Sequence, residues 1–80
     1  MNWVVYIIKC KDRSLYTGIT NNLEARFAAH QAGAGAKYTR GRGPLRLVFS
    51  EEAADRSAAT KRETEIKRLS KAAKGTLIGK

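Results

Sequence analysis

One segment near the start of the chain restricts the fold more than any other feature. Residues 3 to 8 read Trp-Val-Val-Tyr-Ile-Ile, so every position is β-branched or aromatic. Such a run favours a β-strand, and because both alternating faces are apolar the strand must be covered on both sides. A chain of 80 residues has only a small core with which to cover it. We therefore expect one domain over residues 1–80, in which helices flank a small sheet.

The rest of the chain alternates apolar segments with polar turns and helix-capping residues. Asn22 and Asp55 are suited to cap helices, and Gly33 is suited to end one. In the third apolar segment, alternation predicts that Leu45 and Phe49 point inward together with Leu47. The predicted elements are strands at 3–8, 15–19 and 45–50 and helices at 23–31, 56–69 and 71–78. The fold class is α/β in the broad sense (α+β), a three-stranded mixed or antiparallel sheet with about three helices in the order ββαβαα.

Composition excludes several classes of protein. Sixteen Lys and Arg residues against seven Asp and Glu give a net charge of +9, which favours a polyanionic partner and above all nucleic acid. One cysteine (Cys10) and one histidine (His30) cannot build a zinc site or an internal disulfide. The longest apolar run is far too short for a membrane span or a signal peptide, so we expect no membrane partner and a cytoplasmic location. Charge alone does not separate an enzyme from a passive binder.

Two tyrosines lie on the predicted hairpin. If the hairpin is centred on Lys11, Tyr6 and Tyr16 are direct cross-strand neighbours on one face of the sheet. A two-residue turn at Asp12-Arg13 instead places the two rings on opposite faces. Both tyrosines also suit strands as ordinary packing residues.

Two predicted helices carry further candidates. Arg26 and His30 are four residues apart and therefore share a face of the first helix. Arginine binds phosphate and histidine exchanges protons near neutral pH, so the pair suits a phosphate site. The alternative is that both are ordinary solvated side chains. Glu63 lies at the edge of the apolar stripe of the second helix, where a carboxylate can bind a divalent cation. It also forms an i,i+4 pair with Lys67, and Glu65 is paired equally well with Lys61, so helix spacing does not choose between the two glutamates.

The segment from 31 to 44 predicts a long, glycine-rich and basic loop, of a length that is usually functional or mobile. Its cations and its tyrosine suit contact with phosphates and stacking on a base. The predicted nucleic-acid-binding residues are Lys37, Tyr38, Arg40 and Arg42.

Read in order, these residues resemble a known family. Val4-Val5-Tyr6 stands ten positions before Tyr16-Thr17-Gly18, and Arg26, His30 and Glu63 follow at the expected spacing. This pattern resembles the GIY-YIG nuclease superfamily, and most closely its small stand-alone bacterial members. Ile19 departs from the lysine that excision-repair members carry there, which removes one phosphate contact.

The resemblance implies a role for each matched residue. Tyr6 would orient or deprotonate the attacking water, and Tyr16 would contact the scissile phosphate or share the base role. Arg26 and His30 would assist at the phosphate, and Glu63 would bind one Mg²⁺ or Mn²⁺ ion. It is the resemblance, and not helix spacing, that selects Glu63 over Glu65.

The function implied is a divalent-metal-dependent endonuclease that hydrolyses DNA in repair or recombination, with branched or flapped DNA as the candidate substrates. Many family nucleases carry a separate DNA-binding region, so a protein partner that supplies substrate targeting is also expected. The rival hypothesis is a basic nucleic-acid-binding module on the same fold without catalysis.

Overall fold

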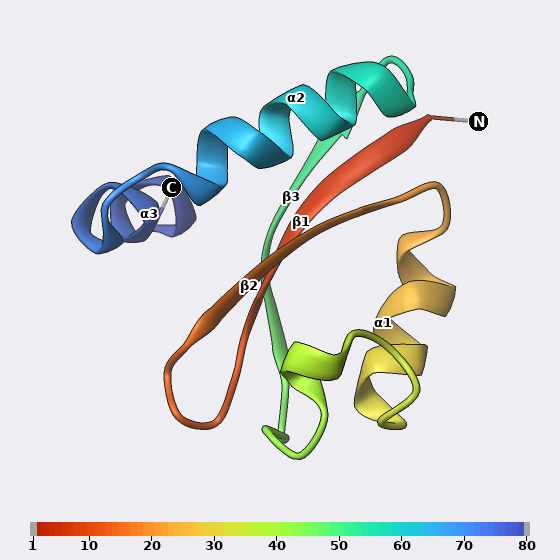
Figure 1. Cartoon of the computed structure of the whole chain (residues 1–80), viewed down its shortest axis with the longest axis vertical. Coiled ribbons are helices and arrows are strands. Elements are labelled where there is room, and N and C mark those ends of the chain that lie inside the picture. Colours follow the sequence, from red (N-terminus) through yellow and green to blue (C-terminus); the bar gives the residue numbers. More distant parts are fainter. Residues whose placement is uncertain (1, 80) are drawn as a thin grey trace.

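The computed structural model describes residues 2–79 and arranges them as three strands, three α-helices and one short 3₁₀-helix (Figure 1). The strands are β1 (Trp3–Lys9), β2 (Leu15–Thr20) and β3 (Arg46–Ala53). The helices are α1 (Leu23–Gln31), η1 (Lys37–Thr39), α2 (Arg56–Lys67) and α3 (Lys71–Ile78). The predicted order ββαβαα is confirmed. η1 lies inside the segment predicted as a loop, and α2 ends before the predicted limit at Leu69.

β1 is the central strand of an antiparallel sheet with the order β2-β1-β3. Val5 and Ile7 are fully buried on the face that α2 and α3 cover, whereas Tyr6 and Ile8 are buried on the face that α1 covers. Figure 1 shows α2 and α3 on one side of the sheet and α1 with η1 on the other. The prediction of a strand covered on both sides is confirmed, and the sheet is purely antiparallel rather than mixed.

The β1–β2 hairpin has a register that neither sequence alternative predicted. Tyr6 pairs with Gly18, and Tyr16 pairs with Ile8. A three-residue turn over 11–13 causes this register, because the Cys10 carbonyl accepts from the Arg13 N–H while the Cys10 N–H donates to the Ser14 carbonyl, each at 2.9 Å. The two tyrosines therefore share a face but are diagonal neighbours, not direct ones.

A β-bulge changes the direction of the side chains along β3. Ile7 pairs with Phe49 but Ile8 pairs with Leu47, so Val48 is the extra residue. Residues on either side of the bulge consequently point to opposite faces. Leu45 is buried beside Tyr6, Phe49 packs on the α2 side, and Leu47 is 40% exposed. The prediction that all three point inward is therefore wrong for Leu47.

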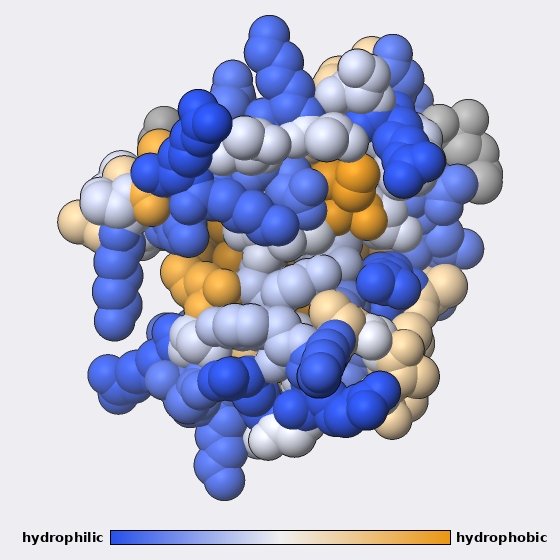
Figure 2. Space-filling model, viewed as in Figure 1, coloured by the Kyte–Doolittle hydropathy of each residue, from blue (hydrophilic) through white to orange (hydrophobic). Residues whose placement is uncertain are grey.

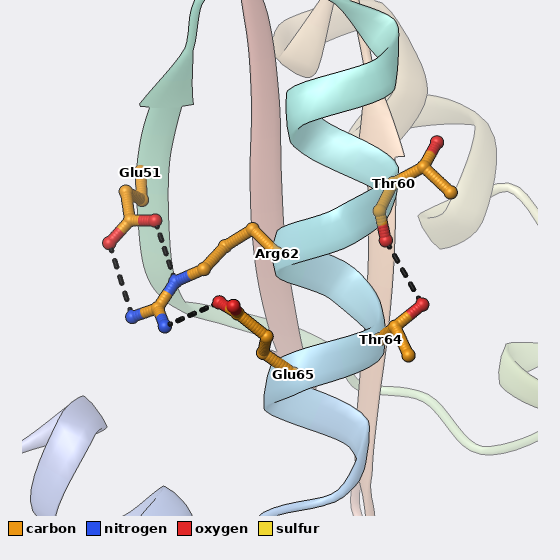
Figure 3. A network of polar contacts seen from close by, with 5 residues as sticks. All are labelled: Glu51, Thr60, Arg62, Thr64 and Glu65. Atoms are coloured by element: carbon orange, nitrogen blue, oxygen red, sulfur yellow. Dashed lines mark hydrogen bonds and ion pairs between the residues drawn. The ribbon is translucent and has the colours of Figure 1, made fainter.

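An arginine ties α2 to β3 (Figure 3). Arg62 donates from Nε to Glu51 Oε2 at 2.8 Å and from a terminal nitrogen to Glu51 Oε1 at 3.4 Å, and it also reaches Glu65 at 3.3 Å. Partly exposed pairs of this kind contribute little stability, about 1 kcal/mol or less. Their forked geometry nevertheless restricts how α2 rotates about its axis, and so it restricts where the next residue, Glu63, lies.

Candidate functional site

The site is built around a hydrogen bond between a strand and a helix. Tyr6 on β1 and His30 at the end of α1 are each 1% exposed, and the Tyr6 hydroxyl lies 2.9 Å from His30 Nε2. Leu23 and Phe27 pack α1 against this face of the sheet, and this packing brings His30 over Tyr6. Two residues that are 24 positions apart in the chain thus form one buried polar pair.

The other histidine nitrogen is held by the 3₁₀-helix. His30 Nδ1 lies 2.9 Å from the Thr39 hydroxyl, which in turn lies 3.0 Å from the Ala36 carbonyl. A carbonyl only accepts, so the Thr39 proton goes to Ala36 and the Thr39 oxygen accepts from Nδ1–H. The Ala36 N–H also lies 3.3 Å from Nδ1 and suits the other tautomer, but the two shorter bonds favour a proton on Nδ1. His30 Nε2 is then free to accept from the Tyr6 hydroxyl.

The second tyrosine joins this pair at its outer side. The Tyr16 ring centroid lies 6.4 Å from that of Tyr6 and 5.3 Å from that of His30. Tyr38 stacks on Tyr16 at 5.8 Å, and the Arg42 guanidinium lies 4.6 Å from the centroid of the Tyr38 ring. Tyr38, which the sequence predicts to stack on a base, thus packs against Tyr16 in this structure, and the residue is still 41% exposed.

Arg26 supplies the positive charge of the site. It is exposed on α1, one turn before His30. Burial lowers the pKa of His30 and the charge of Arg26 lowers it further, so the imidazole is neutral at pH 7. Burial raises the pKa of Tyr6 more strongly than Arg26 lowers it, so the phenol keeps its proton. A neutral phenol that donates to a neutral imidazole is the resting state.

Glu63 on α2 is the candidate metal ligand. Its side chain is 20% exposed and its Oε2 lies 3.5 Å from Lys67 Nζ, so the ordinary helical pair is present too. Helix α2 packs on the Val5 and Ile7 face of the sheet and the tyrosines lie on the other face, so Glu63 is not in contact with them, and its charge is the weakest of the influences that raise the pKa of Tyr6. Within residues 2–79 no three His, Cys, Asp or Glu side chains gather into a metal cluster. A lone carboxylate suits Mg²⁺ or Mn²⁺, which retain water ligands and take oxygens from a substrate.

The basic loop borders the site and is tied to the rest of the protein. Arg42 forms an ion pair with Asp12 in the hairpin, and its carbonyl accepts from the Lys11 N–H at 2.9 Å. Lys37 and Arg40 are exposed, and Arg40 Nε donates to the Gly33 carbonyl at 3.3 Å. A pocket of about 300 Å³ lies between the loop and α1 and reaches His30 and Thr39. The four predicted nucleic-acid-binding residues therefore all lie on or beside η1, and among them Tyr38 stacks on Tyr16 while Arg42 packs on Tyr38.

Three residues that shape the site were not predicted from the sequence: Thr39, Gly35 and Asp12. Asp12 forms the ion pair with Arg42. Thr39 is buried and positions His30, but one threonine in a glycine-rich loop has no periodicity that could reveal it. A Cβ at Gly35 would lie 2.4 Å from His30 Nδ1 and 2.8 Å from His30 Cα. The loop can approach the helix only because this position has no side chain.

The neutral histidine predicts a pH-dependent stability. The pKa of His30 is lower in the folded protein than in the unfolded chain, so the unfolded state binds more protons as pH falls through about 6.5. The melting temperature should fall from pH 7.5 to pH 5.5, with a slope in unfolding free energy of at most about 1.4 kcal/mol per pH unit. His30 is the only histidine, so His30→Gln should flatten the curve. Calorimetry at each pH measures the stability of both proteins. If the stability of the variant changes with pH as steeply as that of the wild type, a group other than His30 causes the pH dependence.

The close approach at Gly35 predicts a large effect of one methyl group. Gly35→Ala should lower the unfolding free energy by about 1–3 kcal/mol, because the new Cβ meets the backbone of α1 as well as a buried ring. Gly75→Ala is the matched control, since nothing lies within 4 Å of its Cβ and alanine favours the helix. Thermal unfolding measures both variants, and a Gly35→Ala protein as stable as the control contradicts the packing described.

Comparison with known proteins identifies the family of the chain. Residues 2–76 match the family model described as the GIY-YIG catalytic domain. The UPF0213 protein CPE1444 of Clostridium perfringens is 58% identical over 98% of this chain and 83% of its own, and plu4503 of Photorhabdus laumondii is 54% identical over 95% and 73%. The solution NMR structure of the UPF0213 protein BH0048 from Bacillus halodurans superposes with a TM-score of 0.63 at 47% identity, covering 99% of this chain and 84% of that one. The chain belongs to the GIY-YIG family, among small proteins of that nuclease superfamily.

Proposed function

We propose that this protein is an endonuclease that hydrolyses DNA phosphodiester bonds with the help of one Mg²⁺ or Mn²⁺ ion. The observation that carries the proposal is the 2.9 Å contact between the Tyr6 hydroxyl and His30 Nε2, with Tyr16 and Arg26 beside it. A buried phenol with a raised pKa is a poor base by itself at pH 7. A phenol that can pass its own proton to a neutral imidazole can act as a base at this pH.

In the proposed reaction, water attacks the phosphorus while one of its protons moves to the Tyr6 oxygen. The Tyr6 proton moves at the same time to His30 Nε2, and the bond from phosphorus to the leaving oxygen breaks, so that this oxygen keeps the bonding electrons and takes a proton from solvent water. Thr39 holds the imidazole in the tautomer that can accept this proton. Arg26 pairs with the phosphoryl oxygens as negative charge develops on them. A divalent ion bound at Glu63 would supply further positive charge to the phosphate and the leaving oxygen.

The test is a cleavage assay in which labelled linear, branched and flapped DNA is incubated with Mg²⁺, Mn²⁺ or EDTA. The proposal predicts metal-dependent strand cleavage that falls steeply with salt, because Lys and Arg contacts release counterions. Binding of DNA without cleavage of any substrate under any metal condition would favour the rival function, a nucleic-acid-binding module. Cleavage that EDTA leaves unchanged would contradict the metal assignment.

Other expectations stay predictions. A preference for branched or flapped DNA, a role in repair or recombination and a targeting partner follow from the resemblance, whereas a cytoplasmic location follows from the short apolar runs of the sequence. In the part of the chain that the structure describes, the helices lack the length and apolar character of a membrane span.

A further inference from the structure

A second basic surface lies away from the tyrosines. A hollow of about 540 Å³ opens between the hairpin and α3, over a floor formed by Leu15, Val48 and Ile78. In Figure 2 an orange floor lies between the hairpin and α3, with blue side chains around it. Five cations line this hollow and the smaller one that adjoins it, and we call them the hairpin cations: Lys9, Arg13, Arg46, Lys71 and Lys74.

The hollow is on the other face of the sheet from the tyrosine site. Leu15, Val48 and Ile78 pack with Val5 and Ile7 in the apolar cluster beneath α2 and α3. The tyrosines and His30 lie on the α1 side. The hairpin cations therefore lie on the opposite face of the sheet from the tyrosine site, and the loop at 31–44 reaches the adjoining hollow only through the ion pair of Arg42 with Asp12.

Arg13 occupies a position that suits glycine. Its φ is 70°, and no other non-glycine residue in the described part of the chain has a positive φ. It stands at the left-handed position of a three-residue hairpin turn, where glycine is the usual choice because a Cβ is strained there. An arginine at this position costs stability, and Arg13 lines both hollows.

Like charges face one another across two strands. Lys9 pairs directly with Arg46 in the register of β1 and β3, and both are exposed. Directly opposed like charges destabilise a sheet. No carboxylate among the described residues lies within 4 Å of either cation.

The third unfavourable arrangement is in α3. Lys71 and Lys74 lie in the first turn of this helix, which contains no acidic residue, although the positive end of a helix dipole favours acids. The one acid in the adjoining hollow, Asp12, is engaged by Arg42. Strain at Arg13, repulsion between Lys9 and Arg46 and this reversed helix charge thus converge on one place. When several unfavourable backbone and charge arrangements occur together at one surface, they indicate that the surface has a function.

We propose that this hollow binds an unpaired strand of nucleic acid, with its phosphates on the hairpin cations and its sugars and bases over the apolar floor. A duplex presents mainly phosphates to such a surface, so it would not use the floor of Leu15, Val48 and Ile78. The inference rests on the nucleic-acid partner of the proposed function and adds a second contact surface on the opposite face. Substrates with an unpaired segment beside the cleaved duplex could engage both faces at once.

Binding in EDTA tests this inference independently of cleavage. Labelled single-stranded and duplex DNA are titrated with the wild-type protein, with Arg13→Gly and with Lys61→Ala, which removes an exposed cation from α2 outside the hollow. Arg13→Gly should weaken single-strand binding about fivefold at 0.1 M salt and lower the salt slope by about 0.7, as for one lost phosphate contact. It should also raise the melting temperature by relieving the turn. Equal binding by Arg13→Gly and Lys61→Ala, or a loss confined to duplex DNA, would overturn the inference.

Lysine acetylation with and without DNA gives a second measurement that needs no variant. Single-stranded DNA should protect Lys9, Lys71 and Lys74 but not Lys61. If these three stay fully reactive while the protein cleaves DNA, the hollow is not a binding surface and the proposed function stands. If they are protected while no DNA is cleaved, the hollow stands and the proposed catalysis fails. Protection by polyglutamate but not by DNA would assign the surface to an acidic protein instead.

Discussion

Replacing Tyr6 by phenylalanine should lower the rate of DNA cleavage by about 10²–10⁴-fold, the usual contribution of a positioned acid or base. The change removes a single oxygen, yet that oxygen is the one that lies 2.9 Å from His30 Nε2. Without it, the attacking water has no route for its proton to the imidazole. Affinity for DNA should be nearly unchanged, because Tyr6 is 1% exposed and contributes no surface charge.

Tyr38→Phe is the matched control for this prediction. It removes the same atom from a ring that stacks on Tyr16, and the ring itself stays in place. The control should keep its rate within about threefold of the wild type, by the ordinary size of a surface effect. Loss of the Tyr6 hydroxyl leaves His30 Nε2 without a partner, which costs about 1–3 kcal/mol of stability, so rates are compared below the melting point of the variant. A Tyr6→Phe enzyme as fast as the control would exclude the proton route.

Replacing Glu63 by glutamine should abolish metal-dependent cleavage, with a loss of about 10³-fold or more because a metal ion contributes several kcal/mol of charge stabilisation. Glutamine has the same shape but no charge, so α2 should stay folded and the pair with Lys67 should be lost at little cost. Loss of the negative charge also removes one of the influences that raise the pKa of Tyr6. This effect on Tyr6 should be small beside the loss of the metal ligand, because the Glu63 charge is the weakest of the influences on the pKa of Tyr6.

Glu65→Gln is the control on the same helix, two positions further on, where the carboxylate pairs with Arg62. It should cleave within about threefold of the wild type, as expected of an exposed ion pair. Paramagnetic Mn²⁺ provides a readout that does not depend on activity, since Glu63→Gln should lose bound Mn²⁺ and Glu65→Gln should retain it. The reverse result would transfer the metal site to Glu65.

Local chemistry was enough to predict most of the elements. The caps at Asn22 and Asp55 accept from backbone N–H groups of the helices that they begin, and α1 has the predicted bounds. The run from Trp3 to Ile8 is buried on both faces of β1 from Val5 onward. Each of these features depends on residues a few positions apart in the chain, and for that reason a single sequence reveals them.

Two features of the strand pairing were not predictable in this way. The hairpin register follows from a turn in which Arg13 adopts a conformation that arginine seldom takes. The bulge at Val48 follows from how β3 matches β1, and it reversed the direction expected of Leu47. Local pattern could not locate either feature, because the energies that decide them belong to pairs of strands.

The sequence by itself determined the elements, the strong positive charge and the set of residues that resembles a GIY-YIG site. Only the tertiary structure decided how those residues lie relative to one another. Packing of α1 on the sheet brings His30 to Tyr6, and Thr39 then selects the tautomer that can accept the phenolic proton. The tertiary structure also gathered the hairpin cations from two strands, a turn and a helix. The physical reason is the same for both sites: proton transfer and charge repulsion depend on distances of a few ångströms, which the folded chain sets between residues far apart in sequence.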